Sequence, residues 1–297
     1  MAIMGVESAE GIKKLDVVTF DELLRAQKPF ETKTPCIDLS SVEFVSPAGM
    51  VQLVSACHAL SRDGRKPGIV LPSTSARSYL SRAGVLSALN GAVTCASKSD
   101  ASLLSAGLVE RGRNSMLLEV TRLDSMGALP RILDRLVVTF RQRLRYTRPT
   151  ALMIATAVSE VCQNAVEHAT EAAGFLAVQV YNGKRRRFVE IGMSDYGPGL
   201  AVTLRRNAMH AGVVSDSQAI RVATKRGTSG ISDDPTRGTG LYHLLEIARK
   251  HAGTVDLRSG TARSRWRMDR DEQAYSFTVP RLCGVHVAIS LPDGGSG

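Results

Sequence analysis

The chain has 297 residues, of which 43% are apolar and 22% are charged, a composition typical of a globular protein with a buried core. No apolar run approaches the roughly 20 residues of a membrane-spanning helix, and the N-terminus lacks the basic-then-apolar pattern of a secretion signal, so we expect a cytoplasmic protein without a membrane partner. The net charge of +10 favours acidic partners such as nucleotides, acidic proteins or nucleic acid. Five cysteines without CxxC spacing indicate reduced, mostly buried thiols.

The first third of the chain has the pattern of a small α/β domain. Residues 35–39, PCIDL, form a short apolar run typical of a buried strand. Ser46 followed by Pro47 is the pattern of a helix N-cap and first helical position, and the helix after it has apolar residues on one face. A second strand is expected within 66–72 and a second helix within 75–90. Strands and helices in this order predict an α/β fold.

The rest of the chain restarts this pattern. We expect a first domain over residues 1–98, a polar linker over 99–112 and a second α/β domain over 113–297. The strands expected in the second domain are 115–123, 174–181, 186–194 and segments near 253–259, 274–280 and 284–291. The helices expected there are about 126–146, 149–170 and 239–252. An Asn-Gly turn between the second and third strands predicts a hairpin.

A polar pair stands out on the second long helix of this domain. Glu160 and Asn164 lie four residues apart in SEVCQNAVEHA, so they share one side of the helix among alanine and valine neighbours. An amide oxygen beside a carboxylate suits a Mg²⁺ ion that keeps most of its waters, with the carboxylate free to act as a base. The pair therefore indicates one side of a site.

Two glycine segments follow in the sequence. In SDYGPGL, Asp195 ends a predicted strand and can accept a hydrogen bond from an exocyclic amine, while Gly197 and Gly199 let the backbone pass close to a flat ring. In RGTGLYHLL, Gly238 and Gly240 open a helix whose first amides can face a phosphate. Each segment alone is a weak signal, but the three in this order predict a single nucleotide site.

These motifs resemble those of a known superfamily. Residues 113–293 look like the ATP-binding domain of GHKL proteins, which include histidine-kinase catalytic domains, gyrase, MutL and the anti-sigma-factor serine kinases. SEVCQNAVEHA resembles the N-box of that family, SDYGPGL its first glycine box and RGTGLYHLLEIARKHAGTVDLRSG its second. The resemblance implies the Bergerat fold, an α/β sandwich with helices on one face of a mixed sheet.

The resemblance also implies ATP and Mg²⁺ as cofactors and a role for each matched residue. Asn164 would hold Mg²⁺, and Glu160 would be the catalytic base and a further metal contact through water. Asp195 would bind the adenine amine, and Gly197 and Gly199 would shape the adenine pocket.

The remaining implied roles concern the phosphates. The residues expected along them are Gly238, Thr239, Gly240 and Leu241. Residues 201–237 would form a mobile ATP lid, from which Arg237, and less directly Lys225 or Arg226, would reach the γ-phosphate.

The type of GHKL protein follows from other residues. A histidine kinase needs an upstream phosphoacceptor histidine, but His58 is the only histidine before the N-box and lacks the acidic neighbour of an acceptor motif. Glu160 and Glu167 match the acids of the ATPase and anti-sigma-kinase branches, although the second domain of gyrase and MutL is missing downstream. We expect His168 and His243 at the pocket edge or in the core.

Residues 34–90 resemble, more loosely, the STAS domain of anti-sigma-factor antagonists. In that family a serine before the glycine of the motif takes a phosphate; aligned on Gly49, this chain has Pro47 there, which has no hydroxyl. We therefore expect Ser46 to act as a helix cap rather than as a displaced acceptor. The resemblance implies a docking or self-association module, with a homodimer as one form.

The sequence thus predicts a bacterial regulatory protein that acts as a Mg-ATP-dependent switch, in which slow hydrolysis controls binding of a protein partner. Three alternatives stay open: a serine/threonine protein kinase of the anti-sigma-factor type, a module that binds ATP without hydrolysis, and a DNA-associated ATPase. Phosphoryl transfer depends mainly on positioning and charge neutralisation, so one geometry can serve water or a serine as nucleophile.

Overall fold

The computed structural model describes residues 11–73, 75–95, 116–123, 127, 129–167, 173–183, 186–228 and 239–295. Over these residues the protein is mixed α/β, as the sequence predicts. None of the described helices has the length and apolar composition of a membrane span. All five cysteines are free, and three of them are buried, which confirms that most are buried.

The larger of the sheets has five strands in the order β6-β7-β8-β10-β9. Their bounds are Met116–Leu123 (β6), Gly174–Asn182 (β7), Arg187–Asp195 (β8), Thr254–Arg267 (β9) and Asp271–Pro292 (β10). Every neighbouring pair is antiparallel, so the expected mixed sheet is wrong for the strands that the structure describes. The two helices that the sequence predicts between β6 and β7 return the chain to the sheet in the opposite direction, whereas the mixed sheet was implied only by the resemblance.

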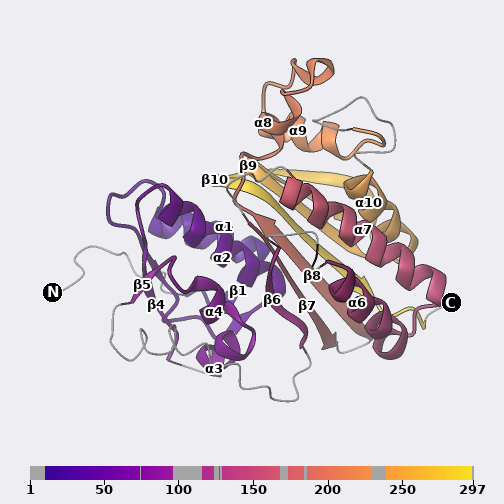
Figure 1. Ribbon diagram of the computed structural model, residues 1–297, viewed down its shortest axis with the longest axis horizontal. Helices are drawn as coiled ribbons and strands as arrows, with labels where there is room; N and C mark the ends of the chain where they lie inside the picture. Colours follow the sequence, from indigo (N-terminus) through magenta and orange to yellow (C-terminus); the bar gives the residue numbers. More distant parts are fainter. Residues whose placement is uncertain are drawn as a thin grey trace.

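Three helices cover one face of this sheet (Figure 1): α6 (Leu129–Leu144), α7 (Arg148–Glu167) and α10 (Gly240–Lys250). Side chains alternate along a strand, and Val189, Ile191 and Met193 of β8 are buried in one apolar cluster with Ile154 and Val158 of α7. The three helices expected in the second domain are confirmed, each to within three residues at either end.

The N-terminal part contains small parallel sheets and several helices. Its strands are β1 (Lys14–Leu15), β2 (Cys36–Asp38), β3 (Phe44–Val45), β4 (Gly68–Val70) and β5 (Thr94–Cys95), paired as β1-β3 and β2-β4-β5. Its helices are α1 (Val17–Gln27), α2 (Pro47–Arg62), α3 (Ser75–Arg82) and α4 (Val85–Leu89). Ser46 caps α2, since its Oγ accepts a hydrogen bond from the Gly49 amide at 3.3 Å. The predicted cap is confirmed.

Two details of this part differ from the expectation. The second expected helix is divided into α3 and α4, because Gly84 has a left-handed φ of 77° that ends the first. Helix α2 is buried on nearly all sides rather than on one face, and even Gln52 and Ser55 are inaccessible. A helix buried all round has protein on both sides, and the second side of α2 faces the larger sheet.

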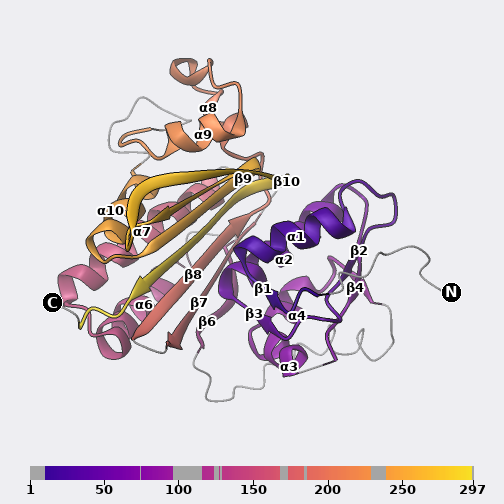
Figure 2. The ribbon, with the colours of Figure 1, turned by 180° about the vertical axis from the view of Figure 1, so that it is seen from behind.

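Helix α2 packs on the sheet face opposite to α6 and α7, as the reverse view in Figure 2 shows. Gly192, which alternates with Ile191 in β8, lies against the start of α2, and a Cβ there would lie 2.6 Å from the Ala48 nitrogen. Glu190 accepts a hydrogen bond from the same Ala48 amide at 3.2 Å. Phe175 of β7 is buried in the N-terminal cluster. The two predicted domains therefore share an interface, and the predicted linker, 99–112, lies outside the described residues.

Buried charges connect α1 with β9 at one side of this interface. The Asp21 carboxylate accepts hydrogen bonds from Arg258 Nε and Arg263 Nε, both at 2.9 Å. Asp256 accepts from Arg263 Nη1 at 3.1 Å and from Arg265 Nε at 2.9 Å. Because Arg258 is 0% exposed and Asp21 is 1% exposed, each charge depends on its partners for compensation.

Strands β9 and β10 form one long bent hairpin where the sequence predicts three short strands. Gly260 has a φ of 58°, and the register shifts beside Leu282. The Met268 amide donates to the Gly253 carbonyl at 3.0 Å, so the outer part of the hairpin folds back to the start of β9. Bends of this kind come from glycine and bulges, which interrupt the alternating pattern that marks a strand.

Candidate nucleotide site

Helix α7 presents the first pair of candidate residues beside its buried stripe. Ile154, Val158 and Cys162 are buried against the sheet, whereas Glu160 and Asn164 are only partly buried. The four-residue spacing places them one turn apart on the same flank, as the sequence predicts. Glu167 belongs to the last turn of α7, while His168 lies outside the described residues.

The second glycine segment meets Glu160 directly. The Thr239 hydroxyl donates a hydrogen bond to Glu160 Oε2 at 2.9 Å, and His243 Nδ1 lies 3.5 Å from the same oxygen. A Cβ on Gly240 would lie 2.8 Å from the Glu160 Cβ, so only glycine allows α10 to begin this close to α7. Leu241 packs beside this junction against the apolar cores.

Helix α10 begins without a cap from the side chain before it. Thr239 is its N-cap, but the Thr239 hydroxyl bonds Glu160 instead of a helix amide. The first amides of a helix have no partner within the helix, and together with the helix dipole they favour an anion. This end of α10 therefore has the chemistry that a phosphate needs.

Asp195 is the last residue of β8, and its carboxylate contacts the loop that follows the strand. Its Oδ1 accepts the Gly197 amide at 2.8 Å and the Val285 amide of β10 at 3.2 Å. Both of these donors use one oxygen, which leaves Oδ2 for another donor. Burial raises the pKa of Asp195 from 3.8 to about 6, although the two amide hydrogen bonds act in the opposite direction. The carboxyl is therefore mostly ionised at pH 7.

The backbone beside Asp195 depends on two glycines. Gly199 has a φ of 83°, and a Cβ there would lie 2.9 Å from Ser259 Oγ. That hydroxyl accepts the Leu200 amide at 2.9 Å and donates to the Gly284 carbonyl at 3.0 Å. A Cβ on Gly284, which has a φ of 92°, would overlap the Asp195 carbonyl. Gly284 and Ser259 are not among the residues that sequence analysis predicts, because nothing local indicates contacts to a loop 60 to 90 residues away.

Helix α7 connects the two ends of the constellation. A Cβ on Gly174 would lie 2.9 Å from the Ala165 Cβ, and Gly174 pairs with Asp195 across β7 and β8. The turn of α7 that carries Asn164 thus lies over the strand end that carries Asp195. One turn earlier, Glu160 contacts the start of α10. The structure therefore brings parts of all three predicted segments to one edge of the sheet.

Other predicted residues are covered only in part. Arg237 and Gly238 lie outside the described residues, as does the end of the predicted lid. The described part of the lid forms α8 (Leu200–Leu204), a 3₁₀ turn (Ala208–His210) and α9 (Asp216–Ala223), which project beyond the sheet edge in Figure 1. Lys225 and Arg226 are exposed just after α9.

The few metal ligands at this site suit a metal ion that is already bound to the phosphates of a nucleotide. Among the described residues there is no group of three or more His, Cys, Asp or Glu side chains that could hold a metal ion. Asn164 would supply one amide oxygen, and Oε2 of Glu160 already accepts a hydrogen bond from Thr239. Mg²⁺ commonly takes one or two protein ligands and completes its shell with phosphate oxygens and water, so this sparse set suits Mg²⁺ bound to a triphosphate.

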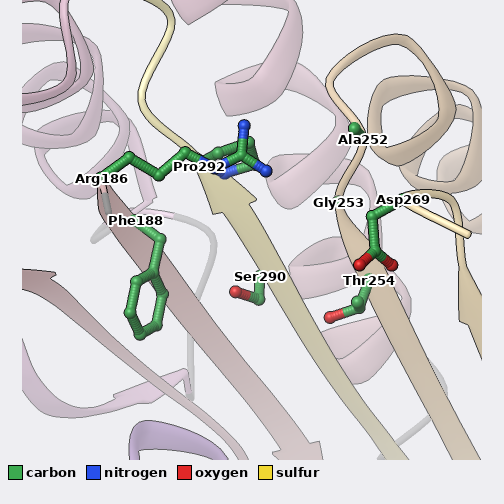
Figure 3. A pocket seen from close by; sticks show the side chains of 8 residues that line it. All are labelled: Arg186, Phe188, Ala252, Gly253, Thr254, Asp269, Ser290 and Pro292. Atoms are coloured by element: carbon green, nitrogen blue, oxygen red, sulfur yellow. The ribbon is translucent and has the colours of Figure 1, made fainter. Parts of the chain in front are cut away.

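A shallow groove of about 230 Å³ lies elsewhere on the molecule (Figure 3). Arg186 and Phe188 line it from the start of β8, Ser290 from the end of β10 and Asp269 from the tip of the hairpin. It is therefore at the other end of β8 from Asp195. None of the predicted site residues lines it, and its open wall lacks the enclosure of a small-molecule site.

Ser46 and its surroundings are closed to solvent. Ser46 is 1% exposed at the interface with the larger sheet, where its side chain hydrogen-bonds Glu190. Pro47 follows it as the first residue of α2. A kinase could reach this serine only if α2 separated from the sheet.

Comparison of the sequence with protein-family models finds no match, and a search of curated proteins also finds none. Any assignment of function therefore depends on the sequence motifs and the geometry of the chain itself.

Proposed function

We propose that this protein is a Mg-ATP-binding regulatory switch, in which the edge formed by α7, the end of β8 and the start of α10 holds the nucleotide. The observation that carries the proposal is the hydrogen bond from Thr239 to Glu160. It joins the predicted catalytic carboxylate to the helix terminus that suits a phosphate, although the two residues are 79 positions apart. The GHKL resemblance of the three segments supports the same reading.

The adenine end of the site would depend on Asp195. With two amides on Oδ1, the carboxylate is held in one orientation and Oδ2 can accept the exocyclic amine of adenine. This interaction needs the ionised form, which dominates above pH 6. A carboxylate that accepts from an amine also discriminates against guanine, which has a carbonyl oxygen at that ring position.

The phosphate end would depend on α10 and α7. The first amides of α10 would bind phosphate oxygens, and Asn164 would hold the Mg²⁺ that neutralises their charge. Glu160 would accept a proton from an attacking water, or from the hydroxyl of a serine on a partner. The Thr239 hydroxyl keeps the carboxylate oriented toward the start of α10. Movement of α8 and α9 on nucleotide binding would then change the surface that a partner binds.

The proposal is tested by incubating the purified full chain with γ-³²P-labelled ATP and Mg²⁺, with and without candidate partner proteins. We expect slow release of free phosphate. Label on a partner serine or threonine would identify the kinase alternative, and bound but uncleaved ATP would identify a binding module. Glu160→Gln is expected to lower turnover while leaving ATP affinity intact. If the chain neither binds nor cleaves ATP, the proposal is wrong.

The DNA-associated ATPase rests only on the net charge of +10. Its test is duplex DNA binding over a range of salt concentrations, because binding through phosphates weakens steeply with added salt. No binding at low salt would remove this alternative.

A further inference from the structure

Tyr196 follows Asp195 in the chain but belongs to the opposite side of the sheet. Its side chain is 5% exposed and is part of the N-terminal apolar cluster. Asp195 continues the row of Ile191 and Met193, which faces the helices α6, α7 and α10. The candidate site thus lies on one side of this loop, and the N-terminal part packs against Tyr196 on the other side.

Helix α2 makes specific contacts with Tyr196. Arg62 Nη1 donates a hydrogen bond to the Tyr196 carbonyl at 2.9 Å, and its guanidinium carbon lies 5.5 Å from the centre of the tyrosine ring. The His58 ring stacks on the same ring, with centroids 5.5 Å apart and planes 23° apart. Burial lowers the pKa of His58, and its Nε2 bonds the Ala88 carbonyl at 2.8 Å. A neutral, oriented imidazole therefore covers the ring without repelling Arg62.

One peptide unit transmits these contacts to the site. The Tyr196 carbonyl and the Gly197 amide belong to the same planar peptide group, in which C=O and N–H point in opposite directions. Arg62 bonds the oxygen of this group, and Asp195 Oδ1 accepts its N–H at 2.8 Å. The guanidinium therefore fixes the plane that orients the Asp195 carboxylate. A cationic donor on the oxygen also polarises the N–H and strengthens the second hydrogen bond.

We infer that Arg62 is a positioning residue for Asp195, and that α2 of the N-terminal part thereby sets the affinity of the candidate site for nucleotide. The effect on nucleotide rests on the proposed function, whereas the effect on the loop does not. The N-terminal part is then a structural component of the site, and any partner that moves the end of α2 alters the adenine end.

The test compares Arg62→Ala with Arg65→Ala in the full chain. Arg65 is the matched control, because its Nη1 donates to the Phe30 carbonyl at 2.8 Å and so bonds only within the N-terminal part. Loss of one such hydrogen bond corresponds to about a fivefold change in an opening equilibrium. We expect Arg62→Ala to speed amide hydrogen exchange at Gly197 and Val285 by about fivefold and to weaken Mg-ATP binding by about the same factor. Arg65→Ala should leave both unchanged.

The outcomes separate the two claims. Unchanged exchange at Gly197 in Arg62→Ala, or equal acceleration in Arg65→Ala, overturns the inference. Faster exchange in a chain that does not bind ATP at all supports the positioning role and contradicts the proposed function. If Arg62→Ala does not fold, Arg62→Lys replaces it, since lysine keeps a cation near the ring but loses the fork of donors. It should speed exchange at Gly197 by about twofold, and wild-type exchange there would overturn the inference.

Discussion

On the side of the five-stranded sheet that α6, α7 and α10 cover, β8 contributes Val189, Ile191 and Met193 to a core made of apolar side chains. On the side that α1 and α2 cover, the same strand contributes Glu190, Gly192 and Ser194. There the packing depends on a glycine against the backbone of α2, on the Glu190–Ala48 hydrogen bond and on buried arginines nearby.

The comparison shows that one strand uses two different means of holding its neighbours. Apolar packing tolerates modest changes of shape, whereas removal of one partner from a buried charge pair is strongly destabilising. On the side of α6, α7 and α10 the contact is apolar, whereas on the side of α1 and α2 an apolar cluster that includes Phe175 is joined by charges and backbone contacts that fix the N-terminal part in one position. The position of the N-terminal part affects the candidate site through the loop at Asp195 and Tyr196, which contacts both faces of the sheet.

The largest effect is expected for Asp21→Ala, which leaves Arg258 and Arg263 buried without their shared partner. Breaking a buried ion pair in this way costs about 3–5 kcal/mol. Urea denaturation followed by circular dichroism measures the loss of unfolding free energy. Asp269→Ala is the control, because Asp269 makes only solvent-exposed pairs, which contribute at most about 1 kcal/mol. Equal losses in the two variants would contradict the structural role of the buried network.

The next largest effect, expected for Asp195→Asn, is a gain of stability rather than a loss. The folded state binds the proton of Asp195 more tightly than the unfolded chain does, since burial raises its pKa from 3.8 to about 6. Its contribution to stability is thus most favourable below pH 3.8 and is lost as pH rises through 6. Asp195→Asn should therefore stabilise the ligand-free protein at pH 8 by up to about 3 kcal/mol, with no gain near pH 4, while nucleotide binding is lost.

Thermal unfolding over this pH range measures the change. The control is Asp134→Asn, an exposed aspartate on α6, for which we expect no such gain. A loss of stability at pH 8 in Asp195→Asn would mean that the carboxylate is structural, and would contradict its assignment to a ligand.

A smaller loss is expected for Gly192→Ala, which tests the contact between β8 and α2. The added Cβ would lie 2.6 Å from the Ala48 nitrogen, and overpacking of this kind costs about 1–3 kcal/mol. Gly212→Ala is the matched control, because nothing lies within 4 Å of a Cβ there. Limited proteolysis and urea denaturation should show a loosened N-terminal part only in Gly192→Ala. The same behaviour in both variants would mean that α2 does not pack closely on the sheet.

The smallest effect is expected at Glu190, where hydrogen bonds from Ser46 and Ala48 partly offset burial. Burial raises the pKa of Glu190 above 4.5. The ionised carboxylate therefore destabilises the folded state at neutral pH, whereas the protonated form in acid does not. Glu190→Gln should raise the melting temperature at pH 7.5, and the gain should shrink as pH falls toward 4.5 and be absent below it. Glu246→Gln, at a partly exposed site on α10, should show no such trend. A pH-independent change in Glu190→Gln would contradict the stated cause.

Sequence patterns predict the helical side well and the other side poorly. The spacing of Ile154, Val158 and Cys162 indicates α7, and with it the shared flank of Glu160 and Asn164. Ser46 is recognisable as a cap because its partner is three residues away. These signals are local in the chain.

The features that sequence analysis missed depend on contacts between distant residues. Asp21 and Arg258 meet across 237 positions, and Arg62 reaches Tyr196 across 134. No local period relates such residues, and a lone arginine on a helix has the pattern of a solvated side chain. The interface between α2 and the sheet was missed for the same reason, since it depends on the absence of a side chain at Gly192.

In the proposed site, residues from α7, β8 and α10 together bind a magnesium nucleotide. Isothermal titration of Mg-ATP into the full chain at pH 8, with Asn164→Ala and Asp195→Ala alongside, tests it most directly. We expect saturable binding of one nucleotide per chain in the wild type, and loss of that binding in both variants. Wild-type affinity in both variants, or no binding to the wild type, would contradict the claim.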